Sequence, residues 1–227
     1  MSDYAISNLL QRVSIFANVD DRAIDSLSDM IISKDYSKGS LVFGQEEPGD
    51  ALFIIAKGRV KIVLYGESGK EITLSFFRKG DFFGEMSLLD DMPRSANVVT
   101  TEDSTLLILK RDDFKKHLVE NPTTAVNVLA ELSKRLRKAD EIIGNLALLD
   151  VYGRVARVLI DLGEKEGEKV EDGMLIRKRP TQQDIASMVS TSRETVSRAL
   201  NEFQKRGLLI MDGKKVILRP QFFREVG

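Results

Sequence analysis

The hydrophobic period of this chain changes at Pro122, and that change limits its possible folds more than any other feature. In residues 31–110, short apolar or alternating runs are separated by glycines, which is typical of antiparallel strands. Beyond Pro122, apolar residues recur at alternating steps of three and four, the heptad pattern of a helix that pairs with another helix. A length of 227 residues suits two small domains. We therefore expect an α+β protein with segments at 1–121, 122–150 and 151–227.

The first segment predicts an antiparallel β-roll preceded by two short helices. Amphipathic spacing favours helices at 6–13 and 21–30. Turn signals such as Gly58 and the sequence Pro48-Gly49-Asp50 separate the apolar runs. Strands are expected at 40–43, 51–56, 59–65, 71–77, 95–100 and 105–110.

The heptad pattern in residues 122–150 predicts one long helix that dimerises with a second copy of the chain. In a coiled coil the repeating apolar positions face the partner helix. We therefore expect a homodimer whose interface holds Leu129, Leu136 and Ile143 at one position and Leu132, Ala139 and Leu146 at the other. A helix packed on its own domain would show a similar pattern, and the sequence leaves that alternative open.

The third segment contains the pattern of a helix-turn-helix. Thr181 and Asp184 have capping-box spacing, so they predict the start of a helix that ends near Val189. Ser192 is placed to cap a second helix at 193–205. Two short helices joined by three residues form a helix-turn-helix.

The flanks of this motif complete a winged domain. A helix is expected at 153–162, followed by a polar loop at 163–173. Apolar runs at 208–211 and 215–218 lie on either side of Asp212-Gly213, a dipeptide that favours a hairpin with a type I′ turn. The third segment is therefore expected to be a winged helix-turn-helix.

Composition narrows the chemistry. No cysteine is present, which excludes disulfides, thiolate metal sites and cysteine nucleophiles. The one histidine, His117, cannot form a multi-histidine metal centre, and we expect it to be a surface or helix-end residue without a role. Neither a nucleophile–base pair nor a metal-ligand set is apparent, so we expect no enzyme activity and no metal.

Hydropathy and charge bear on location and partners. The longest apolar run has six residues, whereas a membrane-spanning helix needs about 20, and residues 1–16 lack the pattern of an export signal. We expect a cytoplasmic protein that does not bind membranes. Residues 151–227 hold 15 Lys/Arg against 11 Asp/Glu, a net charge of +4, whereas residues 1–150 hold 19 against 24, a net charge of −5. The third segment is therefore the candidate for an anionic partner.

One group of polar residues in the roll has the chemistry of an anion site. Gly84 permits close backbone approach, Arg94 supplies a permanent planar cation, and Ser95 adds a neutral donor. Glu85 offers an acceptor for a sugar hydroxyl. Taken one at a time, such residues would be expected to form structural ion pairs.

A second group, on the expected helix at 193–205, has the chemistry of a DNA-reading surface. Arginine pairs with guanine O6 and N7, and glutamate accepts from cytosine N4. Arg193, Glu194 and Arg198 provide both functions, with Glu194 and Arg198 one helical turn apart. The alternative is a surface ion pair between Glu194 and Arg198.

These motifs together resemble the family of bacterial transcription factors that contains the cyclic-AMP receptor protein and the fumarate-and-nitrate regulators, with the greatest resemblance to the cyclic-AMP receptor branch. The resemblance covers nearly the whole chain. It rests on Pro48-Gly49-Asp50, Gly80-Asp81-Phe82-Phe83-Gly84-Glu85, Pro93-Arg94-Ser95-Ala96, Gly144-Asn145-Leu146-Ala147, Asp150-Val151-Tyr152-Gly153-Arg154 and Ser192-Arg193-Glu194-Thr195-Val196-Ser197-Arg198. The missing cysteines exclude an oxygen-sensing cluster, and the place of His117 beyond the last strand excludes a haem ligand in the roll.

The resemblance implies a cyclic nucleotide inside the roll as an allosteric ligand, and no other cofactor. Arg94 and Ser95 would bind the phosphate, and Glu85 the ribose. The further residues expected at the nucleotide are Gly84, Met86, Ala96, Leu74, Ser75, Arg135 and Asp140. Where relatives commonly place a threonine and a serine against the base, this chain has Ala139 and Asp140, and a carboxylate accepts N–H groups from adenine or guanine. Cyclic AMP is the expected ligand, with cyclic GMP and cyclic di-GMP as alternatives.

The resemblance also implies a homodimeric transcription regulator that binds double-stranded DNA, with TGTGA-like half-sites in a palindrome, and that contacts RNA polymerase. The residues expected at DNA are Thr181, Gln182, Ser192, Arg193, Glu194, Thr195 and Arg198. Ser190 stands where relatives usually have a glycine, so we expect a left-handed backbone there. DNA binding without ligand, and a receptor that acts through protein partners, remain as alternatives.

Overall fold

The computed structural model describes residues 3–67 and 69–225. The chain divides into two compact units: an N-terminal unit of residues 1–69 and 73–137, and a C-terminal unit of residues 70–72 and 138–227. The division falls inside the long helix, between Arg137 and Lys138, rather than at either end of it. Each unit has its own hydrophobic core. Among the described residues, no helix is long and apolar enough to cross a membrane.

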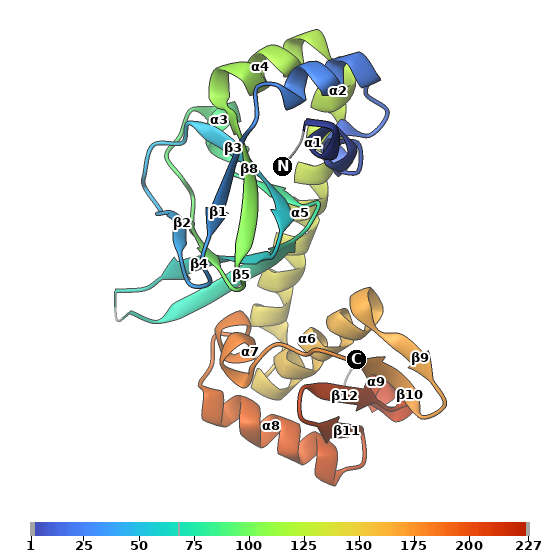
Figure 1. Ribbon diagram of the computed structural model, residues 1–227. Helices are drawn as coiled ribbons and strands as arrows, with labels where there is room; N and C mark the ends of the chain where they lie inside the picture. The colour runs from blue at the N-terminus through green and yellow to red at the C-terminus, as the bar shows by residue number, and fades with distance from the viewer. Residues whose placement is uncertain (1–2, 68, 226–227) are drawn as a thin grey trace. The chain divides into compact units, whose positions relative to one another are not determined.

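The N-terminal unit is a β-roll of two antiparallel sheets (Figure 1), with strand orders β1-β8-β3-β6 and β2-β7-β4-β5. Helices precede, interrupt and follow the strands. The strands are β1 (Ile32–Tyr36), β2 (Leu41–Phe43), β3 (Ala51–Lys57), β4 (Arg59–Tyr65), β5 (Glu71–Arg78), β6 (Phe82–Phe83), β7 (Asn97–Thr100) and β8 (Ser104–Lys110). The helices are α1 (Asp3–Leu10), the 3-10 helix η1 (Ser14–Phe16), α2 (Asp21–Ser28), α3 (Met86–Asp90) and α4 (Arg111–Glu120).

Strand β3 separates two hydrophobic cores, because its side chains alternate between the faces of the sheet. Leu52 and Ile54 join the cluster beneath the helices. Phe53 and Ile55 join a second cluster inside the roll. The six-residue apolar run in the sequence is thus a strand buried on both faces, and its inner face helps to form the interior in which a ligand was predicted.

Two strands of the roll were not predicted, and β7 begins two residues later than expected. Strand β1 has the polar sequence Ile-Ser-Lys-Asp-Tyr, and it exists because it pairs with β8 along its full length. Strand β6 has two residues, too few for a periodic signal, and it pairs with β3. Strand β7 begins at Asn97 rather than residue 95. In each case pairing within a sheet, and not local sequence, decides the boundary.

The long helix α5 (Pro122–Leu148) begins immediately after α4. Asn121 has φ −129° and ψ 78°, which are not helical values, and it separates the two helices. Proline suits the first helical position because its missing N–H has no partner there in any case. The predicted long helix is confirmed.

The C-terminal unit is a winged helix-turn-helix, as predicted. Its helices are α6 (Val151–Glu166), α7 (Gln182–Met188), α8 (Arg193–Lys205) and α9 (Pro220–Glu225). Its strands are β9 (Glu168–Val170), β10 (Gly173–Ile176), β11 (Leu209–Asp212) and β12 (Lys215–Leu218), in the order β11-β12-β10-β9. The inner face of α8, with Val196, Leu200 and Phe203, is buried in the core of this unit.

Two local expectations in this unit were wrong. The segment at 163–173, expected to be a polar loop, has mostly regular secondary structure. Helix α6 continues to Glu166, and the exposed strand β9 pairs with β10. The wing hairpin forms, but Asp212 pairs with Lys215, so its two-residue turn is Gly213-Lys214. Only Gly213 of this pair has a positive φ, 57°, whereas a type I′ turn needs two. Glycine at the first turn position matches a type II′ turn instead.

Candidate functional sites

The candidate nucleotide site lies where β6 leads into α3. Gly84 has φ +85°, and a Cβ atom there would lie 2.7 Å from Nη1 of Arg94 and 3.1 Å from the carbonyl oxygen of Ala51. Both the backbone angle and the lack of space require glycine. The helix α3 then begins directly after Glu85. Glycine thus brings the backbone against the side chain of Arg94.

Arg94 is buried, with 3% of its surface exposed. Its Nη1 donates to the carbonyl oxygen of Gly84 (2.8 Å) and its Nη2 to that of Ala51 (2.9 Å). Its guanidinium carbon lies 4.2 Å from the centroid of the Phe43 ring. Burial lowers the pKa of Arg94, an effect that the Asp50 carboxylate 3.8 Å away opposes. The Nε atom is buried and has no hydrogen-bond partner, so the guanidinium retains an unused donor.

Glu85 is also buried, with 1% of its surface exposed. Its Oε1 accepts a hydrogen bond from Nη1 of Arg135 at 2.8 Å, whereas its Oε2 is buried without a partner. Arg135 comes from α5, donates to the carbonyl oxygen of Phe82 (2.7 Å) and lies over the rings of Phe77 and Phe82. The structure therefore joins Glu85 and Arg135 in one cluster and leaves one acceptor oxygen unused.

The remaining residues predicted at the nucleotide lie in varied settings. Ser95 is exposed and donates to the sulfur of Met86 at 3.9 Å, and Ala96 is buried. On β5, Leu74 is 41% exposed and Ser75 is half-buried. For these residues the assignment to the nucleotide stays a prediction.

An aromatic cluster inside the roll was missed by the sequence reasoning. Phe53 and Phe83 stack with ring centroids 5.2 Å apart, and Phe43 lies 5.5 Å from Phe53. Phe77 lies 6.4 Å from Phe83 and reaches Arg135. The available signal was the alternation of side chains along the predicted strands, which turns these phenylalanines toward the inside of the roll. The cluster forms the apolar wall against which both arginines are held.

The predicted seam on α5 carries a row of exposed apolar side chains. Leu129, Leu136 and Ile143 are 64%, 65% and 64% exposed, and Leu146 and Ala139 are exposed as well. Val126, at 63%, extends the row and was not predicted. Large apolar residues exposed at heptad spacing are the pattern of a helix that pairs with another helix.

Leu132 differs from the prediction because it is half-buried and packs against the core of its own unit. At 3.6 residues per turn, Leu132 and Asp140 lie about 40° to opposite sides of Leu136. Arg135, which reaches Glu85, is on the Leu132 side. Asp140 therefore lies next to Leu136 at the edge of the seam, on the side away from Arg135.

The helix-turn-helix presents the predicted triplet to solvent. Arg193, Glu194 and Arg198 are exposed on α8. Arg198 donates to the hydroxyl of Thr195 at 3.1 Å, and its guanidinium is held at the helix surface. The pKa of Glu194 is lowered, first by its backbone N–H and then by the hydroxyl of Ser192. The triplet is therefore charged and accessible.

The caps of both helices are as predicted. Thr181 accepts from the N–H of Asp184 (3.1 Å), and the N–H of Thr181 donates to the carboxylate of Asp184 (3.0 Å), which completes a capping box. Ser192 accepts from the N–H of Thr195 at 3.2 Å. Ser190, in the turn, has φ 55°, which confirms the expected left-handed backbone.

A cationic groove beside α7 was not predicted. It has a volume of about 480 Å³ and is lined by Thr181 and Gln182 together with Arg179, Arg193 and Lys214. Burial lowers the pKa of Arg179, whose N–H donates to the carbonyl oxygen of Lys214 (3.0 Å) and so ties the groove to the wing. Its charge suits phosphate.

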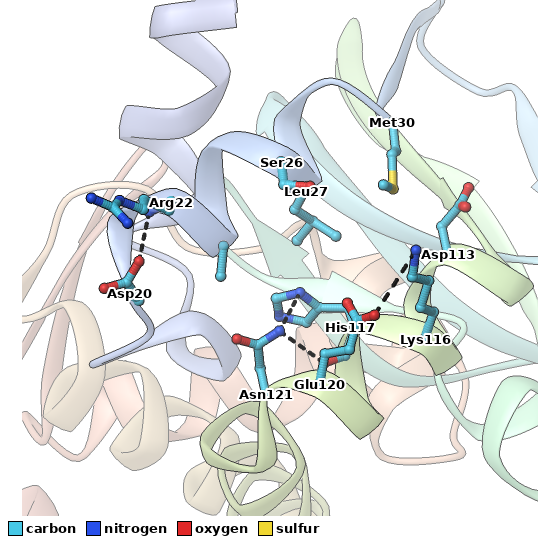
Figure 2. Close-up of a pocket in the computed structure, with 11 residues that line it drawn as sticks. Asp20, Arg22, Ser26, Leu27, Met30, Asp113, Lys116, His117, Glu120 and Asn121 are labelled. Carbon is cyan, nitrogen blue, oxygen red and sulfur yellow. Dashed lines mark hydrogen bonds and ion pairs between the residues drawn. The ribbon is translucent and has the colours of Figure 1, made fainter.

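The prediction for His117 was wrong in one respect: the residue lies in the last turn of α4, but it is buried rather than at the surface. It lines a pocket of about 360 Å³ whose other lining residues come from α2, α4 and the residues next to them. Figure 2 shows these side chains. The amide nitrogen of Asn121 donates to the carbonyl oxygen of His117 (3.1 Å) and faces its Nδ1 (3.3 Å), so Nδ1 is the acceptor. Nε2 then carries the proton toward Thr124 Oγ1 at 2.9 Å. Burial lowers the pKa of His117, which favours this neutral form.

Comparison with known proteins assigns a domain family to a large part of each unit. A family model of the cyclic nucleotide-binding domain matches residues 33–121, and a model of the Crp-like helix-turn-helix domain matches residues 153–225. The "CRP-like cAMP-activated global transcriptional regulator" of Mycobacterium tuberculosis is 33% identical over 94% of this chain and 95% of its own length. The "cAMP-activated global transcriptional regulator CRP" of Escherichia coli is 34% identical over 85% of this chain and 91% of its own length.

Solved structures agree with these matches. The c-di-GMP responsive global regulator CLP of Xanthomonas campestris is similar with a TM-score of 0.75 and 28% identity, over 88% of this chain and 99% of that one. The catabolite activator protein of Thermus thermophilus has a TM-score of 0.55 and 32% identity, over 94% and 97%. Two matched domains in this order, and relatives aligned over nearly their full length, lead to one assignment. The chain belongs to the CRP family of cyclic-nucleotide-binding transcription regulators.

Proposed function

We propose that this protein is a homodimeric, cytoplasmic regulator whose ligand is cyclic AMP and which binds a DNA palindrome with TGTGA-like half-sites. One observation carries the ligand proposal: Nε of Arg94 and Oε2 of Glu85 are both buried and both without a hydrogen-bond partner. Native structures satisfy nearly all buried polar groups. A donor on a cation and an acceptor on an anion, both unused, favour a ligand that completes them.

A 3′,5′-cyclic nucleotide has the matching chemistry. Its phosphate is an anion for Arg94, and such charge-assisted bonds are the strong ones. Its ribose keeps one free hydroxyl, at the 2′ position, which can donate to Oε2 of Glu85. The cyclic nucleotide-binding domain match over residues 33–121 includes both side chains.

The identity of the base is proposed from the names of relatives and from Asp140. Two relatives are cAMP-activated by name, and a structural neighbour is named as c-di-GMP responsive. Asp140 is exposed at the edge of the seam. In a dimer that holds the base at this seam, its carboxylate would accept from adenine N6 or from guanine N1 and N2. Cyclic GMP and cyclic di-GMP are therefore the alternatives to be measured beside cyclic AMP.

The dimer and the DNA complex are supported by surface chemistry. The exposed row Leu129, Leu136 and Ile143 would be covered by a second copy of α5. In the DNA complex, Arg193, Glu194 and Arg198 would read bases, while Thr181, Gln182, Ser192 and Thr195 would contact phosphates. Contact with RNA polymerase is part of the same proposal, and a receptor acting through protein partners is the alternative.

Calorimetry of the purified protein against cyclic AMP, cyclic GMP and cyclic di-GMP tests the ligand. Arg94→Ala should abolish binding because it removes the cation for the phosphate. Lys79→Ala, which removes an exposed positive charge from the turn before β6, is the control. Equal affinity of the Arg94→Ala variant and the parent would refute the site.

A further inference from the structure

Arg111, the first residue of α4, contacts the segments around the proposed phosphate site. Its Nη2 donates to the carbonyl oxygen of Ser87 in α3 (3.0 Å) and to that of Gly49. Its Nη1 donates to the carboxylate of Asp91. Its backbone N–H donates to the carbonyl oxygen of Asp50 at 2.8 Å. One residue thus joins three segments: its own helix α4, the loop before β3, and α3 with the residue that follows it.

The segments that Arg111 joins are the ones that enclose Arg94. A Cβ atom on Gly49 would lie 2.3 Å from Cβ of Ser87 and 3.2 Å from Cζ of Arg94. The loop at Gly49 therefore packs directly on Ser87 and on the guanidinium of Arg94, with no space for a side chain between them. Because Arg111 holds the carbonyl oxygens of both Gly49 and Ser87, it controls the spacing of the walls around Arg94.

Asp91 adds a third anchor at the end of α3. It has a left-handed backbone, with φ 58°, and its carboxylate also accepts from Lys115 at 2.9 Å. The Lys115 ammonium and then Arg111 hold the pKa of Asp91 below its ordinary value. Asp91 is largely exposed, and an exposed ion pair contributes little by itself. The importance of Arg111 therefore lies in joining three segments with one rigid planar group.

The charge of Arg111 adds to the positive potential around Arg94. Arg111 is a nearby positive charge that disfavours the charged form of Arg94, after the larger effect of burial. Two guanidiniums close together raise the local positive potential, which an anion relieves. Arg111 is partly exposed, at 27% of its side chain, and its donors point to protein atoms.

From these contacts we infer that Arg111 is a positioning residue for the nucleotide site: without touching the ligand, it keeps α3 and the Gly49 loop in the arrangement that binds phosphate. This role rests on the proposed nucleotide function. If loss of the contacts reduces the ordered arrangement to about one tenth of the population, the apparent Kd rises about tenfold. Arg111→Lys should recover only part of this, because an ammonium is a compact donor that cannot span the three segments.

The test compares Arg111→Gln, Arg111→Lys and Lys115→Gln in the full chain. Lys115→Gln is the matched control, because Lys115 also pairs with Asp91, whereas the hydrogen bonds to the carbonyl oxygens of Gly49 and Ser87 come from Arg111. Calorimetry with cyclic AMP should show about a tenfold loss for Arg111→Gln, a smaller loss for Arg111→Lys, and less than a twofold change for Lys115→Gln. Asp91→Asn combined with Arg111→Gln should add little, because the two act through one contact.

Hydrogen exchange without ligand provides a second readout. The amides of Leu88 and Leu89 donate to the carbonyl oxygen of Glu85 at 3.0 and 3.1 Å. In Arg111→Gln these α3 amides should exchange faster, while the amides of the β3–β8 pair keep their protection. If the parent binds none of the nucleotides, the proposed ligand is wrong, and the exchange of α3 still decides the role of Arg111. Unchanged α3 exchange, unchanged affinity in a parent that binds, or equal loss of protection in β3 and β8 would each overturn the inference.

Discussion

The ligand 2′-deoxy-cyclic AMP should bind this protein much more weakly than cyclic AMP, because it lacks the hydroxyl that Oε2 of Glu85 would accept. That oxygen is buried and has no other partner, and Glu85 is 1% exposed, so bulk water cannot replace the lost donor. A hydrogen bond to a charged group contributes about 1.5–3 kcal/mol. At about 1.4 kcal/mol per factor of ten, calorimetry should show a loss of about 12- to 140-fold.

The same comparison in Glu85→Gln isolates the contact. Glutamine keeps an oxygen for Arg135, which Oε1 of Glu85 now binds at 2.8 Å, so the fold should be retained. Removal of the charge leaves a neutral hydrogen bond of about 0.5–1.5 kcal/mol, and the loss of affinity for the deoxy ligand should fall to about 2- to 12-fold. Asp90→Asn, an exposed change of the same charge on α3, should leave this loss at its parent value. Affinities for the two ligands within a factor of two in the parent would refute the assignment of Glu85 to the ribose.

Three further predictions concern other parts of the chain. Leu136→Asp should convert the dimer to monomers, because it places a charge in the exposed seam. Val119→Asp, the same kind of change at an exposed site on α4, should leave the dimer intact, and light scattering distinguishes monomer from dimer. The free energy of unfolding should fall as pH drops from 6.5 through the lower native pKa of His117 and be fully restored above 6.5, and urea titrations should show this slope lost in His117→Gln. Ser190→Gly should stabilise the C-terminal unit by up to about 1 kcal/mol because φ is 55° there; a lower thermal midpoint would contradict it.

Local sequence patterns predicted the elements that depend on local physics. The capping residues Thr181 and Ser192, the two helices of the helix-turn-helix, and the break at Pro122 follow from hydrogen-bond chemistry within a few residues. The left-handed Ser190 followed from comparison with glycine at that turn. Such features survive because tertiary contacts reinforce the local preference.

Features set by long-range contacts could not be read from the sequence. Strand β1 exists through its pairing with β8. The burial of Arg94 beneath Phe43 depends on residues about 50 positions apart meeting inside the roll. Leu132 has the heptad spacing of a seam residue, yet α5 turns it toward its own core, because periodicity defines an apolar stripe and not the surface that will cover it. The contacts of Arg111 similarly form only because α4, α3 and the loop at Gly49 meet in the folded chain.

Ligand-dependent DNA binding is the central claim, and fluorescence anisotropy with a labelled TGTGA-type palindrome tests it most directly. Two recognition helices must lie about 34 Å apart to read half-sites one DNA turn apart, and we propose that the nucleotide sets this spacing. Coupling free energies of 1–3 kcal/mol are typical, so cyclic AMP should tighten binding to the palindrome by about 5- to 150-fold and leave binding to a duplex with scrambled half-sites nearly unchanged. Equal affinity for the palindrome without nucleotide and with each of cyclic AMP, cyclic GMP and cyclic di-GMP would contradict the proposal.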